Sequence, residues 1–480
     1  MEKTNPKISD SDDARSPSEN EKHVEGGVPV DVVTTPDPDE GLSEEERKHI
    51  DRKLLWKLDI QLIPWLCLLY LISFLDRTNI GNAKIDGLQE DLNLTNNEYN
   101  DTLTIFFISY SLFEPLTQIL LKRFKPSIFL PTIMILWGIC MTTMGLVHNF
   151  SGLMAARWFL GLTEAGLFPG VNYYLSCWYR RSEFGIRAAI FFSAAALAGS
   201  FGGLLAAAIV QMDGVHDFPD EAKFLSEDDR RRVIRRLKLD KQSSAEHEAF
   251  KLQYFWAAAT DWKTWTGAMI YMGCDGALYA FSLFIPTIIQ QMGYKSIHAQ
   301  LLSVPPYAVA AAVTIFVGFI ADRTRMRGYC NMVMALFGIA GFGMLLGSGE
   351  PHVQYAGTFL GAMGIYPCIP NTITWTANNV EGVYKRGIAL GFVIGWGNLN
   401  GIMSSNIYRA QDKPRFRPGH AVVLGYEAVF LLGGSILQHV LLRRENAKRR
   451  AGERDVWVEG KTEDEIEKLG DQRPDFMYTL

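Results

Sequence analysis

The sequence has few cysteines and few histidines, and neither set follows the spacing of a metal site or a disulfide framework. The six cysteines stand singly, mostly within apolar runs, so we expect them to pack rather than react; they are Cys67, Cys140, Cys177, Cys274, Cys330 and Cys368. No glycine-rich loop ending in Lys and Ser or Thr is present, which argues against direct use of ATP. No hydrolytic set of side chains stands out either. We therefore expect no enzyme activity, no cofactor, no metal and no nucleic-acid partner.

Residues 1–50 hold few aromatic or branched apolar side chains and many Asp, Glu, Ser and Pro. A segment of this composition cannot bury enough apolar surface to offset the entropy of ordering it. It also lacks the basic and then apolar pattern of a cleaved signal peptide. We predict a disordered acidic tail on the cytosolic side.

Long apolar runs begin at about Trp56. The mean hydropathy of the whole chain is only +0.03, because polar tails offset these runs. Each run has about twenty residues, the length that crosses ~30 Å of hydrocarbon as a helix. We predict an all-α polytopic membrane protein with about eleven spans, near 57–76, 102–121, 128–147, 152–175, 187–210, 266–290, 301–321, 329–348, 354–376, 387–408 and 420–442.

The basic residues of the short loops predict the orientation of the spans. Lys122 and Arg123 follow the second span, and Arg180 and Arg181 precede the fifth, which places both loops in the cytosol. The fifth span must then end outside the cell. Yet the charged stretch 216–241 and the loops of the second half both require a cytosolic central loop. The short connector between the fifth span and this stretch cannot cross a bilayer.

A sixth span missing at the Val215–His216 junction would reconcile these observations. Two halves of six spans would then result, a pseudo-symmetric plan known among transporters. We attribute the missing span to an omitted exon or a mis-drawn splice junction. The predicted divisions are 1–50 for the acidic tail, 51–215 for the first half, 216–262 for a central loop with an amphipathic helix, 263–445 for the second half and 446–480 for a cytosolic tail.

Two acid–base sets within the spans are candidate functional residues. Asp76 and Arg77 stand at the end of the first apolar run, and Arg157 and Glu164 lie two helical turns apart in the fourth, on one face. Ionisable residues in a span are costly and point to function. The acids can exchange protons, and the guanidinium groups can hold a carboxylate. The alternatives are an interfacial anchor for the first set and a structural ion pair for the second.

The second half contributes two further sets of polar residues. Asn371, Trp375 and Asn398 could complete a substrate pocket by hydrogen bonding and stacking, although such residues can equally hold helices together. The loop "GFIADRTRMRG" carries a charge cluster that we predict to be a conformational latch. Its predicted members are Asp322, Arg323 and Arg325.

Six stretches resemble the fungal allantoate permease family, in the anion:cation symporter branch of the major facilitator superfamily. They are "FLDRTNIGNAK", "RWFLGLTEAGLFPG", "FPDEAKFLSEDD", "AQLLSVPPY", "SSNIYRAQDKPRFRPGH" and "GDQRPDFMYTL". The resemblance implies two six-helix halves and proton-coupled uptake of a small organic anion across the plasma membrane. Family members carry nicotinate, allantoate, ureidosuccinate, pantothenate or biotin. The coupling and anion-binding set of the wider branch matches Asp76, Arg77, Arg157 and Glu164.

We therefore predict a proton-coupled transporter that works by alternating access as a monomer in the lipid bilayer, with both termini cytosolic. Asp76 and Glu164 would carry protons. Arg77 and Arg157 would attract the carboxylate, with Arg157 also holding Glu164 when the site is empty. The alternative is a non-transporting relative, a nutrient sensor or a defective gene product, because one span is missing. A channel and a membrane-bound enzyme explain the acid–base set less well.

Overall fold

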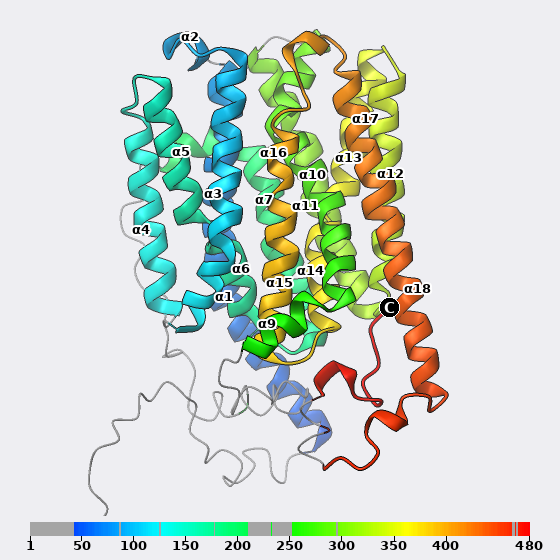
Figure 1. Ribbon diagram of the computed structural model, residues 1–480. Coiled ribbons are helices and arrows are strands. Elements are labelled where there is room, and N and C mark those ends of the chain that lie inside the picture. The colour runs from blue at the N-terminus through cyan, green and yellow to red at the C-terminus, as the bar shows by residue number, and fades with distance from the viewer. Residues whose placement is uncertain are drawn as a thin grey trace, which may run out of the picture. The chain divides into compact units, whose positions relative to one another are not determined.

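The computed structural model describes residues 43–85, 88–123, 126–176, 178–209, 232, 252–293, 296–462, 466 and 469–480. All regular structure in these residues is helical, as the apolar runs predict. The long helices stand side by side in Figure 1, with the short α2 (Leu88–Asp91) at one end. At the other end lie α9 (Leu252–Ala259) and the segment after the last long helix. We call these ends the loop face and the tail face.

The first half contains five long helical segments among the described residues. Its first segment, α1 (Glu44–Ile85), extends beyond the predicted run at both ends, so Asp76 and Arg77 lie inside a helix and not at its end. The fourth predicted span is broken after Glu164, next to Gly166 and Pro169. The remaining segments are α3 (Asn96–Arg123), α4 (Pro126–Met144), α5 (Phe150–Glu164) with α6 (Leu167–Ser176), and α7 (Arg181–Ile209).

The second half contains six long helical segments. They are α10 (Trp262–Gln291), α11 (Ser296–Thr324), α12 (Arg327–Gly347), α13 (Pro351–Ile365) with α14 (Cys368–Asn378), α15 (Val383–Asn398) with α16 (Asn400–Ser404), and α17 (Arg417–Tyr426) continued by η5 (Glu427–Gly433) and α18 (Gly434–Arg450). The break between α13 and α14 falls in the fourth segment of this half, as the break between α5 and α6 does in the first. The matched breaks agree with two related halves.

Five described helices are long and apolar enough to cross a membrane by themselves. They are Glu44–Gly81, Trp262–Gln291, Leu301–Thr324, Arg327–Gly347 and Arg417–Arg450, with Ile128–Met144 as a shorter apolar helix. Large apolar side chains such as Ile135, Ile139 and Leu336 are exposed on these and neighbouring helices. An apolar exterior of this kind suits contact with lipid, since acyl chains are as apolar as the side chains.

The predicted junction at Val215–His216 and the amphipathic helix at 216–241 lie outside the described residues, apart from Arg232. The described segments number five before this region and six after it. That arrangement is the one expected for a chain without the sixth span, and the junction itself stays a prediction.

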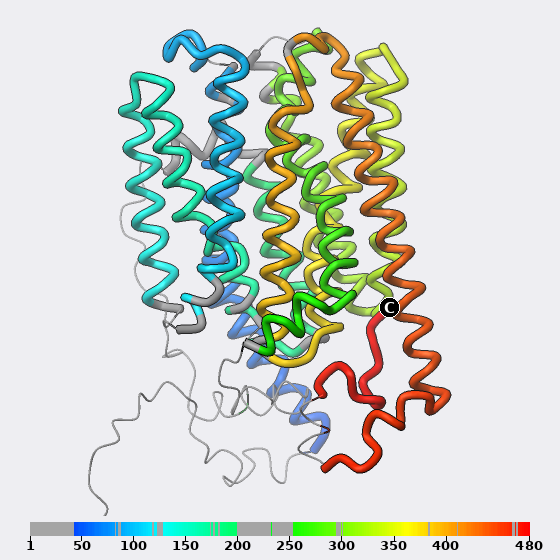
Figure 2. The backbone as a smooth tube through the Cα atoms, in the orientation of Figure 1, coloured from blue at the N-terminus to red at the C-terminus, as the bar shows by residue number. Residues whose placement is uncertain are grey.

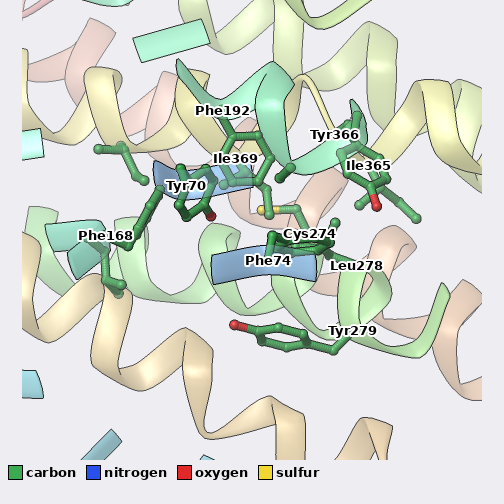
Figure 3. Packing of buried hydrophobic residues seen from close by; sticks show 14 of the residues in the cluster. Tyr70, Phe74, Phe168, Phe192, Cys274, Leu278, Tyr279, Ile365, Tyr366 and Ile369 are labelled. Carbon is green, nitrogen blue, oxygen red and sulfur yellow. The ribbon is translucent and has the colours of Figure 1, made fainter. Parts of the chain in front are cut away.

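The two halves pack through α7 with α11 and α14, α3 with α15 and α16, α6 with α15, and α1 with α10. Aromatic side chains fill the space between them. Tyr70 stacks on Phe168, with ring centroids 5.1 Å apart, and Phe192 reaches Tyr366 of the second half at 6.3 Å. Figure 3 shows this packing around Cys274 and Leu278. Buried aromatic contact therefore also joins the two halves.

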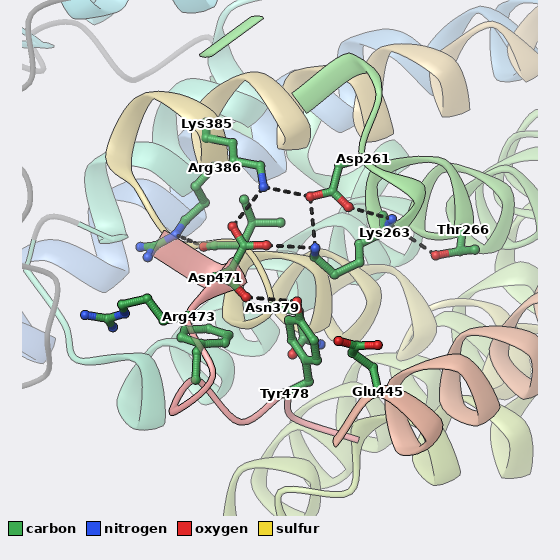
Figure 4. Close-up of polar contacts among 12 residues, drawn as sticks. Asp261, Lys263, Thr266, Asn379, Lys385, Arg386, Glu445, Asp471, Arg473 and Tyr478 are labelled. Carbon is green, nitrogen blue, oxygen red and sulfur yellow. Dashed lines mark hydrogen bonds and ion pairs between the residues drawn. The ribbon is translucent and has the colours of Figure 1, made fainter. Parts of the chain in front are cut away.

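The last residues of the chain fold back onto the tail face of the second half (Figure 2). We call residues 469–480 the clasp segment. Asp471 of this segment lies 2.7 Å from the ammonium of Lys263 and 2.8 Å from that of Lys385. Asp261 bridges the same two lysines, at 2.9 and 2.8 Å, so charges of opposite sign alternate (Figure 4). Burial raises the pKa of Asp261, but the two ammonium groups outweigh burial and hold that pKa below its ordinary value.

Backbone pairing holds the end of the clasp segment. The Asn446 amide bonds both backbone groups of Tyr478, at 2.8 and 2.9 Å. The Asn379 amide does the same for Thr479, at 3.0 and 2.8 Å. Arg449 donates to the Tyr478 hydroxyl at 2.8 Å. The tail predicted for 446–480 is thus, over its last residues, an ordered part of the second half.

Candidate functional site

A buried ion pair joins α1 to the end of α5 in the first half. Nη2 of Arg77 donates to Oε1 of Glu164 at 2.8 Å, and both side chains are at least 95% buried. The hydroxyl of Ser73, one turn earlier on α1, donates to the same oxygen. The guanidinium also lies over the Tyr110 ring, 4.6 Å from its centroid. Two charges that would be costly in a span therefore compensate each other.

Arg77 also begins a chain of hydrogen bonds into the second half. Its Nη1 donates to the hydroxyl of Tyr279 on α10 at 2.7 Å. That hydroxyl donates to Oδ1 of Asn398 on α15 at 2.7 Å, and Nδ2 of Asn398 donates to Oε2 of Glu114 on α3 at 2.8 Å. We call Glu164, Arg77, Tyr279, Asn398 and Glu114 the central network. It passes between the halves twice, so relative movement of the halves must strain or break it.

Arg157 does not hold Glu164 in this structure. The two residues are seven positions apart on α5, which separates their Cα atoms by about 10.5 Å along the axis. Arg77 from the neighbouring helix takes that position instead. Arg157 is buried, and its Nε and Nη2 have no hydrogen-bond partner within the described part of the chain. Its donors are therefore free for a ligand.

Asp76 is partly buried on α1, one residue before Arg77. Electrostatic interactions link its carboxyl to Arg157 and to Glu164. The two acid–base sets predicted from the sequence are thus brought together, with their partners exchanged: Arg77 pairs with Glu164, and Asp76 interacts with Arg157.

Asn371 and Trp375 lie elsewhere. Their helix, α14, ends at Asn378 near the tail face (Figure 1), and both side chains bond residues outside the central network. The Asn371 amide binds Arg327, through Oδ1 at 3.0 Å and Nδ2 at 2.9 Å. Nε1 of Trp375 donates to the backbone oxygen of Thr479 in the clasp segment at 2.9 Å. Of the three residues predicted for the pocket in the second half, Asn398 alone joins the network.

The predicted latch region, at the end of α11, contacts the first half. Asp322 accepts a hydrogen bond from the backbone nitrogen of Ile186, on α7 of the first half, at 2.5 Å, and another from Arg327. Arg323 and Arg325 are exposed. The structure therefore corrects the membership of the predicted latch, because its arginine is the buried Arg327. The reason is local: α12 begins at Arg327 and turns that side chain back onto α11.

Three buried residues near Arg77 were not predicted from the sequence. Glu114 and Tyr279 belong to the central network, and Asp275 lies one turn before Tyr279 on α10. Each acid is a single carboxyl within an apolar run, the same signal that points to Glu164. Applying that rule to every span would have found both. Groups of three or more His, Cys, Asp or Glu that could hold a metal do not occur within the described residues.

Apolar helices in two related halves, with a buried charged network between them, describe a polytopic helical membrane protein. The family model described as "Major Facilitator Superfamily" matches residues 66–216 and 219–405. The chain belongs to this superfamily. The two matched stretches meet next to the predicted Val215–His216 junction.

Similar proteins are fungal transporters. The chain is 35% identical over 442 residues to an uncharacterized transporter of Schizosaccharomyces pombe, covering 84% of this chain and 87% of that protein. It is 30% identical to the high-affinity nicotinic acid transporter of Saccharomyces cerevisiae, covering 95% of this chain and 90% of that protein.

Among solved structures, the transporter FucP in its outward conformation matches with a TM-score of 0.57 and 12% identity, covering 79% of this chain and 99% of that chain. At this identity the likeness establishes the fold alone. Fold and relatives are those of transporters and not of enzymes.

Proposed function

We propose that the protein is a proton-coupled uptake transporter for a small organic anion, of the allantoate permease branch. The observation that carries the proposal is the pairing of Arg77 with Glu164 beside an Arg157 that keeps unpartnered donors. A carboxylate entering the site meets two guanidinium groups, one of them held by an acid that a proton can neutralise.

Competition for Arg77 provides the coupling. When Glu164 takes up a proton, its attraction for Arg77 falls, and the guanidinium can turn to the substrate carboxylate. When Glu164 loses that proton on the other side of the membrane, it recaptures Arg77 and the substrate is released. Asp76, which interacts with Arg157, provides a second carboxyl that can bind a proton. Protonation of Glu164 frees Arg77 to bind the substrate carboxylate, and a substrate bound to Arg77 leaves Glu164 free to keep its proton. Substrate and proton therefore travel together.

The central network links this exchange to the movement of the halves. Arg77 donates to Tyr279 through Nη1 and to Glu164 through Nη2. A change of partner at one of these nitrogens therefore alters the hydrogen bond made by the other. The latch at Asp322 would hold the tail face closed while the site is open to the loop face. Asn371 and Trp375, which bond Arg327 and Thr479, then have structural rather than substrate-binding roles.

Several observations support the anion and the orientation. A relative at 30% identity carries the printed name of a nicotinic acid transporter. The loop charges Lys122, Arg123, Arg180 and Arg181 support a cytosolic location for the tail face. We propose the plasma membrane as the location and a monomer as the working unit. Similarity to transporters over most of the chain does not favour a sensor or a defective product.

Uptake in a host without its own permease tests the proposal. Cells that express the protein should accumulate nicotinate or another small carboxylate at external pH 5 and lose this accumulation when the proton gradient is collapsed. Glu164→Gln should abolish uphill uptake and retain exchange of substrate across the membrane. Glu350→Gln, an exposed acid at the start of α13, is the matched control and should behave as wild type. Uphill uptake by Glu164→Gln would contradict the coupling role.

A further inference from the structure

The clasp segment reaches the start of α12, beside the arginine of the latch. The backbone nitrogen of Gly328 donates to the backbone oxygen of Leu480 at 3.4 Å. Gly328 directly follows Arg327, whose buried side chain bonds Asp322. Two consecutive residues of α12 therefore carry the two contacts, one to the clasp segment and one to the latch.

Helix α14 makes a second connection between the same two places. Nε1 of Trp375 donates to the backbone oxygen of Thr479 in the clasp segment at 2.9 Å. One turn earlier, the Asn371 amide bonds the side chain of Arg327 at 3.0 Å and its backbone oxygen at 2.9 Å. The Trp375 ring also rests on Gly328, where an added Cβ would lie 3.0 Å from two ring carbons. One face of α14 therefore fixes the clasp segment and the latch arginine to each other.

The latch in turn reaches the first half. Asp322 bonds Arg327 and accepts a hydrogen bond from the backbone nitrogen of Ile186 on α7 at 2.5 Å. A Cβ at Gly185 would collide with both Asp322 and Arg327, so the glycine lets α7 approach this pair closely. The Ile186 amide therefore reports, from the first half, whether the latch is closed.

We propose that the clasp segment controls the latch: docked residues 469–480 hold Arg327 against Asp322, and their release lets the tail face open. This inference rests on the latch of the proposed function. A segment that docks on the closed form better than on the open form shifts the population toward the closed form. Asn371, Trp375 and Gly328 are then positioning residues, because they act on the tail face through Arg327. The docked segment thus limits the opening that releases substrate on that side.

Two anchors of the clasp segment lie on helices other than α12 and α14, which makes the proposal testable. Asp471 bonds Lys263 of α10 and Lys385 of α15, and Asn446 of α18 holds both backbone groups of Tyr478. Asp471→Asn removes a negative charge from between two ammonium groups, and Asn446→Ala leaves two backbone groups unpaired. Together these changes should release the segment without altering a residue of the latch.

Hydrogen–deuterium exchange of the full-length protein, read by mass spectrometry of overlapping peptides, tests the inference. The variant that combines Asp471→Asn with Asn446→Ala should exchange faster at the amides of Tyr478 and Thr479, which are paired in the docked segment. It should also exchange at least about threefold faster at Ile186. A purely local role of the clasp segment would accelerate exchange at Tyr478 and Thr479 alone.

Asp475→Asn combined with Lys448→Ala is the matched control. Both residues are exposed, one in the clasp segment and one on α18. This control should exchange like wild type at Ile186 and at Thr479.

Asp322→Asn tests the path from the clasp segment to the first half. It weakens the latch directly, so exchange at Ile186 should rise. Adding Asp471→Asn and Asn446→Ala to this variant should then raise exchange at Ile186 by less than about twofold more, whereas independent sites would multiply their effects.

The outcomes separate this inference from the proposed function. Wild-type exchange at Ile186 in a variant whose clasp amides exchange faster overturns the inference and leaves the latch intact. Clasp amides that stay as protected as in wild type overturn it too, because the segment is then held by contacts other than those assigned here. Where the combined variant does not fold, Asp471→Asn alone decides in the same way. If Asp322→Asn leaves Ile186 unchanged, the latch fails together with the inference, whereas carboxylate uptake tests the coupling at Glu164 separately.

Discussion

Arg77 on α1 and Tyr279 on α10 join the two halves of the protein by a 2.7 Å hydrogen bond between Nη1 and the phenolic oxygen. Tyr279 passes the interaction on to Asn398. Arg77 thus has one nitrogen committed to each half, since its Nη2 binds Glu164. A change of partner at Glu164 can therefore alter the contact of Arg77 with the opposite half directly, without any intervening loop.

Tyr279→Phe should remove this link and little else. The change leaves Nη1 of Arg77 and Oδ1 of Asn398 without their partner, so we expect a loss of about 1–3 kcal/mol in the free energy of unfolding. Uptake should slow while the fold is kept. Thermal unfolding of purified protein and initial uptake rates measure the two effects, with the exposed Tyr329→Phe as the control. Wild-type stability and rate in Tyr279→Phe would show that the bond is incidental.

Arg157→Lys should lower the affinity for a carboxylate by about tenfold or more while the charge is kept. The ammonium of lysine cannot present two parallel donors, as the planar guanidinium can. Because Arg157 has no hydrogen-bond partner among the described residues, the stability of the unliganded protein should change little. Competition by carboxylates measures the affinity. Arg323→Lys, on the exposed neighbour of the latch, is the matched control.

Asp322→Asn should loosen the latch. It weakens bonds to Arg327 and to the Ile186 backbone, and loss of a charge-assisted hydrogen bond costs about 1.5–3 kcal/mol. The open form at the tail face should then become at least about tenfold more populated. Cys330, partly buried on α12, is a native reporter. Its maleimide labelling, followed by peptide mass mapping, should accelerate in Asp322→Asn. Arg323→Gln should label like wild type, and equal rates in both variants would argue against the latch.

Acid should weaken the clasp segment. Asp261 has a lowered pKa when folded, so its contribution to stability is complete above the ordinary Asp value of about 3.9 and is lost as pH falls through the lower, folded value. Asp261→Asn should be less stable at pH 7 and should lose less stability between pH 5 and pH 3 than wild type. Unfolding curves in detergent measure this, with the exposed Asp455→Asn as control. Parallel pH profiles in all three proteins would contradict the role of Asp261.

Sequencing the transcript across the Val215–His216 junction tests the missing span. The alignment to the Schizosaccharomyces pombe relative extends over 442 residues, yet 84% of this 480-residue chain is about 403 residues. About 39 alignment positions therefore have no counterpart here. We expect an additional coding segment that includes about twenty apolar residues, enough for one span. A contiguous junction in abundant, transporting protein would show that the loop-charge argument is wrong.

The apolar runs predicted the helices well because length and hydropathy are properties of one segment at a time. The ends of the helices were harder to predict from the sequence. Polar residues on both sides of the first run continue the helix, so α1 reaches from Glu44 to Ile85 and encloses Asp76 and Arg77. A hydropathy pattern ends where polarity begins, whereas a helix continues while packing supports it.

The hydrogen-bond and ion-pair partners of the site residues were harder to predict from the sequence than the helices that carry these residues. Spacing places Arg157 and Glu164 on one face of a helix, but the partner of Glu164 comes from α1, and one sequence does not say which helices are neighbours. The same limit applies to Asn371 and Trp375. Their position relative to the central network depends on where α14 begins after the break at Tyr366 and Pro367. Glu114 could have been predicted without knowing which helices are neighbours, because a single acid within an apolar run can be recognised in the sequence.

The clasp segment follows every membrane helix in the chain, so the ribosome makes it last among these elements. Until Asp471 docks, Lys263 and Lys385 face Asp261 alone, and the amides of Asn379 and Asn446 lack the backbone groups that they bind. Before the clasp segment docks, the tail face therefore has surplus positive charge and amide groups without these backbone partners. Docking of this segment neutralises that charge and completes those hydrogen bonds, whether or not a substrate is present.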